Sequence, residues 1–353
     1  MRAVFVPLAI LVLTAAVPLP AQQQHRYLYV AAPSDDDPAD RSVRILVFDI
    51  ESAHRLVKRI PLWPAPPAGE EAELVRGIAA SEATGRLFIS TTRRLAAIDL
   101  NTGRPVWEKS YSSHCCDRIS VSPDGQTVYA PAFGASRWYV ISAATGDLRN
   151  TITGMGWPRQ AAYSPDGQRV ALGAWESETL DVADTASHEV IRRVGPFSGF
   201  LCPFTLNAKG NTVFANVDGL VGFEVGDMQT GLLLDTVIVD DVGKEEAAQY
   251  ECPSHGIGFS PDFRELWVAD GVRNRVHVFD ATTYPPVASA AIEMPGQPLW
   301  ITFSRNGDYV YPATGDVIDA KTRKIIGSLT DETGAKVISE QVVEVDWHGT
   351  PTP

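Results

Sequence analysis

The chain has 353 residues, a net charge of −13 and a sequence pI near 5.0. Nucleic-acid binding needs a basic patch, and no basic stretch occurs, so we expect no nucleic-acid partner. The length could hold two ordinary domains, but closed all-β folds of this size often form one domain.

The N-terminus has the three parts of a secretory signal peptide. Arg2 precedes an apolar run from Ala3 to Val17, and the small residue Ala21 stands before the polar Gln22. The alternative is a transmembrane anchor, but the run is shorter than the roughly 20 apolar residues that span a bilayer. We therefore predict a signal peptide at 1–21 and a single domain at 22–353. The mature protein is expected to be exported, periplasmic or extracellular, without a membrane span.

One pattern recurs along the mature chain. An apolar run ends in Ser-Pro-Asp-Gly or a variant of it, and a run of β-branched and aromatic residues follows. Asp-Gly supplies the positive φ of a tight hairpin. Consecutive marker positions are 41, 42, 43, 53 and 44 residues apart, and they are Ser81, Ser122, Ser164, Asn207, Ser260 and Ser304. A period of roughly 40–45 residues with several short strands is typical of radial β-repeats.

Each repeat predicts four strands, and helical periodicity is missing between them. Complete units are predicted at 73–111, 112–153, 154–195, 196–241, 251–292 and 295–330. Residues 26–61 supply three further strands and residues 341–347 supply one, so both chain ends would complete a seventh unit. The predicted fold is all-β: a seven-bladed β-propeller with four antiparallel strands per blade. The N- and C-terminal strands close it in one blade, which leaves no open edge between blades.

The repeated frame resembles the YVTN-type seven-bladed β-propeller repeat, a WD40-like architecture. The likeness rests on Ser-Pro-Asp-Gly, on Val-Tyr-Ala or Leu-Trp-Val after it, and on Val-x-Val-Phe-Asp; it is clearest at 254–280 and covers about 26–348. Similar propellers include exported binding proteins, lactonase-like enzymes and the heavy or β-subunits of quinoprotein amine dehydrogenases. A fold with this many activities does not choose among them.

In the propellers that this chain resembles, the first strand of each unit lines the central channel. Five residues before the marker, five of the six units carry an ionisable side chain: Arg76, Asp117, Arg159, Cys202 and His255. The sixth unit has Leu299, and the C-terminal strand offers Gln341. Convergent polar groups predict a ligand site at the channel mouth. The alternative is a water-filled channel that tolerates polar residues. For enzyme chemistry, His255 is the general-base candidate, Asp117 a carboxylate, and Arg76 and Arg159 anion clamps.

The four cysteines lie beside the same strand starts. Cys202 and Cys252 could form a disulfide between adjacent blades, as an exported chain allows. Cys115 and Cys116 could form a vicinal disulfide, although their Cα atoms, about 3.8 Å apart, are closer than in most disulfides. The third alternative is a copper or zinc site made by His114, Cys115, Cys116 and Cys252.

We therefore expect an exported, monomeric propeller that binds a small ligand or a partner protein at the channel mouth. The alternative is an enzyme or enzyme subunit, either lactonase-like or similar to the β-subunit of a quinoprotein amine dehydrogenase. No Gly-x-Ser-x-Gly, phosphate-loop or His-Glu-x-x-His motif occurs, so a binding protein is favoured. The sequence names no cofactor.

Overall fold

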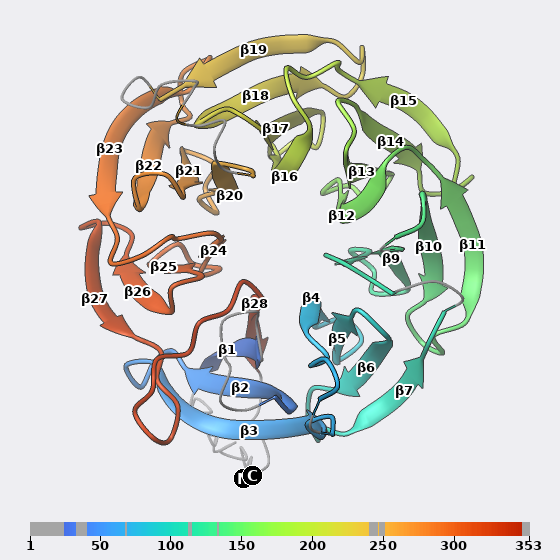
Figure 1. Ribbon diagram of the computed structural model, residues 1–353, viewed down its shortest axis with the longest axis vertical. Helices are drawn as coiled ribbons and strands as arrows, with labels where there is room; N and C mark the ends of the chain where they lie inside the picture. Colours follow the sequence, from blue (N-terminus) through green and yellow to red (C-terminus); the bar gives the residue numbers. More distant parts are fainter. Residues whose placement is uncertain are drawn as a thin grey trace, which may run out of the picture.

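The computed structural model describes residues 25–32, 41–67, 69–111, 115–132, 134–239, 246 and 251–347. Its strands form seven four-stranded sheets that stand as blades in a ring around a central channel (Figure 1). The predicted seven-bladed β-propeller is therefore confirmed. The predicted signal peptide lies outside the described residues. Among the helical segments of the described ranges, none has the length and apolarity to span a bilayer.

Each blade runs from an innermost strand at the channel to an outermost strand at the rim of the ring. Blade 1 consists of β28 (Val342–Trp347), β1 (His25–Ala32), β2 (Val43–Asp49) and β3 (Arg55–Trp63). Blade 2 consists of β4 (Val75–Ser81), β5 (Arg86–Thr91), β6 (Leu95–Asp99) and β7 (Pro105–Lys109). Blade 3 consists of β8 (Ser120–Val121), β9 (Thr127–Pro131), β10 (Arg137–Ser142) and β11 (Leu148–Thr153). Blade 4 consists of β12 (Trp157–Tyr163), β13 (Arg169–Trp175), β14 (Leu180–Asp184) and β15 (Val190–Val194).

The other three blades follow the same order. Blade 5 consists of β16 (Leu201–Leu206), β17 (Thr212–Val217), β18 (Gly222–Asp227) and β19 (Leu233–Ile238). Blade 6 consists of β20 (Ser254–Phe259), β21 (Glu265–Asp270), β22 (Arg275–Asp280) and β23 (Val287–Glu293). Blade 7 consists of β24 (Ile301–Phe303), β25 (Tyr309–Pro312), β26 (Asp316–Asp319) and β27 (Lys324–Ser328). We call the end of the channel at which the innermost strands begin the channel mouth.

Blade 1 is closed by both ends of the chain, as the sequence predicted. The C-terminal strand β28 pairs antiparallel with β1, with Tyr29 opposite Val343. The approach to β28 is fixed as well, because Ala31 N donates to Gln341 O at 2.9 Å and Ser339 Oγ donates to Ala31 O at 2.7 Å. This closure leaves the innermost strand of blade 1 hydrogen-bonded like those of the other blades.

The Ser-Pro-Asp-Gly turns have a local reason for their composition. In blade 3, Ser122 Oγ donates to the Asp124 carboxylate and accepts the backbone N–H of Gln126 at 3.1 Å and of Thr127 at 3.0 Å. Gly125 has a φ of +70°, and a Cβ there would lie 2.2 Å from Ser81 Oγ of the preceding blade. The glycine therefore permits both the hairpin and the close approach of neighbouring blades.

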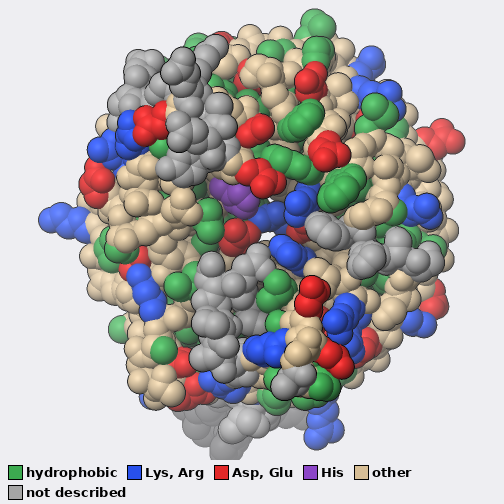
Figure 2. Space-filling view, viewed as in Figure 1, with side chains coloured by type: hydrophobic (Ala, Val, Ile, Leu, Met, Phe, Trp, Pro, Cys, Tyr) green, Lys and Arg blue, Asp and Glu red, His purple; other side chains and the backbone are tan. Residues whose placement is uncertain are grey.

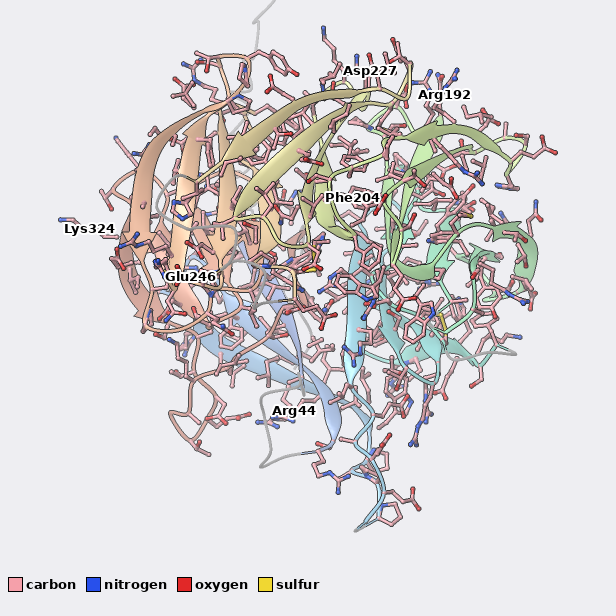
Figure 3. All side chains as sticks on the ribbon, turned by 45° about the horizontal axis from the view of Figure 1, so that its top comes forward. Arg44, Arg192, Phe204, Asp227, Glu246 and Lys324 are labelled. Atoms are coloured by element: carbon pink, nitrogen blue, oxygen red, sulfur yellow. A yellow bond between two sulfur atoms is a disulfide. The ribbon has the colours of Figure 1, made fainter. Side chains whose placement is uncertain are left out.

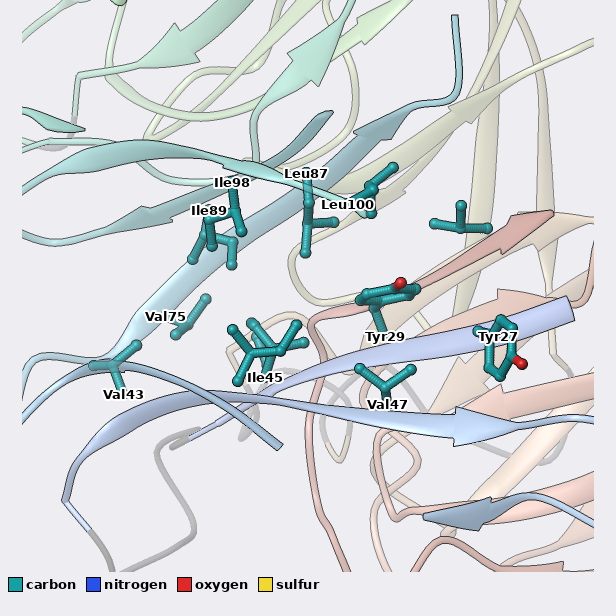
Figure 4. Close-up of a cluster of buried hydrophobic side chains, with 13 residues drawn as sticks. Tyr27, Tyr29, Val43, Ile45, Val47, Val75, Leu87, Ile89, Ile98 and Leu100 are labelled. Carbon is teal, nitrogen blue, oxygen red and sulfur yellow. The ribbon is translucent and has the colours of Figure 1, made fainter. Parts of the chain in front are cut away.

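The hydrophobic core lies between the faces of adjacent blades. Between blades 1 and 2, Tyr29 and Ile45 pack with Leu87 and Ile89, all nearly inaccessible to solvent (Figure 4). Alternation of apolar side chains along each strand supplies one such face to each neighbouring blade. Each blade thus completes its core only with its neighbours, which is the physical basis of the repeat.

A second inter-blade contact involves histidine. His54 lies in the turn between β2 and β3 with a φ of 56°, and its Nε2 is 2.9 Å from the Tyr311 hydroxyl of blade 7. His188 occupies the matching turn of blade 4 with a φ of 58°, and its Nδ1 is 2.6 Å from the Tyr129 hydroxyl of blade 3. In blade 3 the same left-handed turn position is held by Gly146. Each histidine therefore connects the outer turn of one blade to the second strand of the blade before it.

Candidate functional site at the channel mouth

Four of the sequence-predicted site residues lie at irregularities of the innermost strands. The register between the first and second strands shifts at Arg76 in β4, Arg159 in β12, Cys202 in β16 and His255 in β20. Such bulges bend the strand and re-aim a side chain. The fifth residue, Asp117, precedes the short strand β8. The aligned position thus coincides with a bulge at the start of four of the innermost strands.

Asp117 and Arg159 form an ion pair between blades 3 and 4. Arg159 Nη1 donates to Asp117 Oδ2 at 3.1 Å, and Arg118 N donates to Asp117 Oδ1 at 3.0 Å. The Asp117 side chain is 2% exposed, whereas that of Arg159 is 31% exposed. The buried carboxylate therefore fixes a guanidinium group that solvent can reach.

Arg118 reaches across the channel from blade 3. Its Nη2 donates to Glu340 Oε2, just before β28 of blade 1, and its Cζ lies 4.4 Å from the ring centre of Trp300, just before β24 of blade 7. Burial would raise the pKa of Glu340, but the charges of Arg118 and Arg76 and the hydrogen bond from Arg118 oppose it, and the pKa lies below its usual value. Glu340 is therefore ionised at neutral pH, and Arg76 acts on the same carboxylate. Figure 2 shows blue, red and purple side chains gathered around the central hollow.

Alignment of the internal repeats did not select Arg118 or Glu340. Each is adjacent to an aligned position, Asp117 and Gln341, and so was not selected when one residue was taken per repeat. The ionisable pair Asp117-Arg118 was the available signal. A search for neighbouring charged residues at each strand start would have found it.

His255 is held in one tautomer by an unusual turn. Its Nδ1 is 2.9 Å from Leu299 O, and because a carbonyl only accepts, Nδ1 carries the proton. Leu299 has a φ of 43°, and Trp300 N donates to Pro298 O across it. This three-residue turn is of a rare, strained kind, which concentrates at functional sites.

The charge state of His255 is set by its surroundings. Burial lowers its pKa and outweighs Glu340, whose Oε1 lies 3.9 Å from Nδ1 and would raise it. The imidazole is therefore neutral at pH 7. Strand β20 can lie this close to the backbone of Trp300 because residue 256 is glycine: a Cβ there would lie 2.6 Å from Trp300 Cα.

Side-chain amides fix the backbone around the mouth. Gln160 Nε2 donates to Phe204 O at 2.9 Å and Phe204 N donates to Gln160 Oε1 at 3.1 Å, which joins β12 to β16; Phe204 is labelled in Figure 3. Asn216 Nδ2 donates to His255 O at 2.8 Å. These bonds satisfy backbone groups that the bulges remove from strand pairing. The mouth is therefore a fixed arrangement.

The cysteines are paired in disulfides. Cys202 is bonded to Cys252 with a Cα–Cα distance of 5.7 Å, which joins β16 to the segment before β20, and Cys115 is bonded to Cys116. A disulfide sulfur is not a thiolate, so the metal-site alternative for Cys115, Cys116 and Cys252 gives way to two cross-links. His114 lies outside the described residues. Within the described ranges, no group of three or more His, Cys, Asp or Glu residues could hold a metal ion.

Other hollows lie away from the mouth. One of about 590 Å³ is at the opposite end of the channel, where Arg305 pairs with Glu82 and Arg305 N donates to Glu344 Oε2 at 2.9 Å. Others of about 510 and 410 Å³ lie along the hairpins between blades 6 and 7 and between blades 5 and 6. The charged groups at the far end connect blades 1, 2 and 7, so a structural role accounts for them.

Fold and site together define a seven-bladed β-propeller with an ionisable channel mouth. No protein-family model matches the sequence, and no curated protein matches it. Among solved structures, the chain is similar to hydrazine synthase from Kuenenia stuttgartiensis, with a TM-score of 0.63 and 15% identity over 82% of this chain and 90% of that chain. Identity this low supports the propeller fold alone. The likeness to the YVTN repeat stays a resemblance.

Proposed function

We propose that this chain is an exported seven-bladed propeller that binds a small anionic ligand at the channel mouth. The observation that carries the proposal is the charge of the mouth. Three guanidinium groups, of Arg76, Arg118 and Arg159, face two carboxylates there, in a chain whose net charge is −13. A local cationic excess inside a low-dielectric channel attracts anions.

Arg159 is the residue proposed to contact the ligand. Asp117 orients its guanidinium group, and 31% of the side chain is exposed. Guanidinium groups bind carboxylates and phosphates through paired, charge-assisted hydrogen bonds. Arg118 is 15% exposed and bound to Glu340, so its proposed role is to hold Glu340 in position.

Export is supported by the N-terminal pattern of residues 1–21 and by the cysteine pairing, since disulfides persist in oxidising compartments. N-terminal sequencing of the protein recovered from the periplasm or medium should begin at Gln22. A cytoplasmic protein that begins at Met1 would contradict this part of the proposal.

The binding proposal is tested by calorimetric titration with aromatic and aliphatic carboxylates, against their methyl esters. The variant R159M should weaken binding of carboxylates about 10- to 100-fold, since a charge-assisted hydrogen bond is worth about 1.5–3 kcal/mol. The matched control is R193M, because Arg193 pairs with buried Asp181 at 2.9 Å on the outer strand of the same blade. Equal losses in both variants, or no carboxylate binding at all, would contradict the proposal. Copurification of a cofactor-bearing chain would instead favour the enzyme-subunit alternative.

A further inference from the structure

The mouth contains one hydrogen-bond acceptor that none of the described side chains occupies. Because Nδ1 of His255 donates to Leu299 O, Nε2 of the neutral ring carries a lone pair. Among the described residues, Nε2 makes no hydrogen bond, and 23% of the side chain is exposed. The contact with Leu299 therefore fixes the ring in one tautomer and leaves Nε2 as an acceptor in a side chain that solvent reaches in part.

His255 is close to the carboxylate that the arginines of the mouth act on. Glu340 lies between the Arg118 guanidinium group and the His255 imidazole, with Oε2 bound by Arg118 and Oε1 3.9 Å from His255 Nδ1. The Trp300 ring packs against both His255 and Arg118, with its centre 6.2 Å from the His255 ring centre and 4.4 Å from Arg118 Cζ. Arg118, Arg76 and His255 thus lie around one carboxylate, which places the cationic groups and the imidazole in the same part of the mouth.

We infer that the ligand of the mouth is a carboxylate that carries a hydrogen-bond donor, an O–H or N–H, next to the carboxyl group. The inference rests on the proposed function and specifies its ligand class. A carboxylate without such a donor would place its own lone pairs near Nε2 and leave that acceptor unsatisfied. Sites built around a polar group discriminate strongly against ligands that lack its partner.

The rim suggests the rest of the ligand. Trp157 is 45% exposed and lies two residues before Arg159 in β12, and Phe200 is 39% exposed and lies just before β16 of the next blade. The Phe200 ring packs edge-on against Trp175, with centres 6.1 Å apart. Exposed aromatic rings beside a guanidinium group suit a ligand with an apolar or aromatic body.

Four probes separate the two recognition elements on the unaltered protein. Mandelate has the carboxylate and the hydroxyl, phenylacetate lacks the hydroxyl, and the methyl esters of both lack the charge. We expect mandelate to bind about tenfold more tightly than phenylacetate, as one satisfied hydrogen bond implies. Both esters should bind more weakly than their acids. Because this comparison uses only the unaltered protein, its outcome does not depend on whether a variant folds.

Variants then assign the preference to His255. In H255F the ratio of mandelate to phenylacetate affinity should fall to about one, whereas H255Q should retain part of it through its amide oxygen. The control H188N, in a turn at the opposite end of the blades, should keep the full ratio.

The outcomes separate this inference from the proposed function. Equal binding of mandelate and phenylacetate, with both esters weaker, would overturn the inference and leave anion binding in place. A preference that survives in H255F would also overturn it. Failure of all four probes to bind, or esters that bind as tightly as acids, would contradict the proposed function itself.

Discussion

The contact between His54 and Tyr311 should make the closure of the ring sensitive to pH. His54 is 9% exposed, and its ring lies 4.8 Å from Tyr309 as well as against Tyr311. Burial lowers its pKa to about 4, Arg26 adds to that shift, and Glu51 and Asp49 oppose it. In the unfolded chain the pKa is about 6.5. The unfolded state therefore binds a proton more readily, and stability is lost as the pH falls from about 6.5 towards 4.

The size of the effect follows from the two pKa values. Between pH 7.5 and 5, a folded pKa of about 4 against about 6.5 unfolded removes roughly 2 kcal/mol of unfolding free energy. The variant H54N is suitable because asparagine tolerates the φ of 56° at this position. It should cost about 1–3 kcal/mol at pH 7.5 through the lost hydrogen bond. It should also remove the titration, so that its stability falls less with pH.

The assay is urea unfolding at pH 7.5, 6 and 5, followed by tryptophan fluorescence and circular dichroism. Coincident transitions are required for a free energy to be assigned. The difference between wild type and H54N should narrow by roughly 2 kcal/mol at pH 5. H188N serves as a comparison with a smaller expected change, because His188 is less buried than His54. Parallel pH profiles of wild type and H54N would refute the reasoning.

Three further predictions concern the ring and the mouth. Truncation before Gln341 removes β28 and exposes β1, so the protein should melt at lower temperature and self-associate in light scattering; a monomer with unchanged melting would contradict the closure. The double variant C202S/C252S should lose up to roughly 4 kcal/mol in urea unfolding, as the loop closed by a disulfide with a sequence separation of 50 implies; an unchanged midpoint would show that the bond contributes little. The variant G256A should weaken carboxylate binding and lower stability by about 1–3 kcal/mol, because its Cβ would meet Trp300 Cα at 2.6 Å; wild-type affinity would mean that the turn tolerates displacement.

The blade count and the closure could be predicted because they depend on local and periodic signals. The Asp-Gly hairpins repeat at nearly equal spacing, and each half of blade 1 lacks what the other supplies. Such signals need no knowledge of distances across the ring.

The contacts of the mouth depend on the closed ring and could be predicted only in part. Repeat alignment found Arg159 and His255, since equivalent strand starts share a bulge. It did not find that Arg118 reaches Glu340, because that contact depends on channel width and side-chain length. The inter-blade histidines were missed for another reason: His54 and His188 occupy a turn position that blades 2, 3 and 5 fill with Gly103, Gly146 and Gly231.

A crystal structure of the protein with mandelate bound would test the central claim most directly. The account predicts ligand density at the channel mouth, with the carboxylate within hydrogen-bond distance of Arg159 and the hydroxyl on His255 Nε2. Density confined to the hollow of about 590 Å³ at the other end of the channel, with the mouth unchanged, would contradict it.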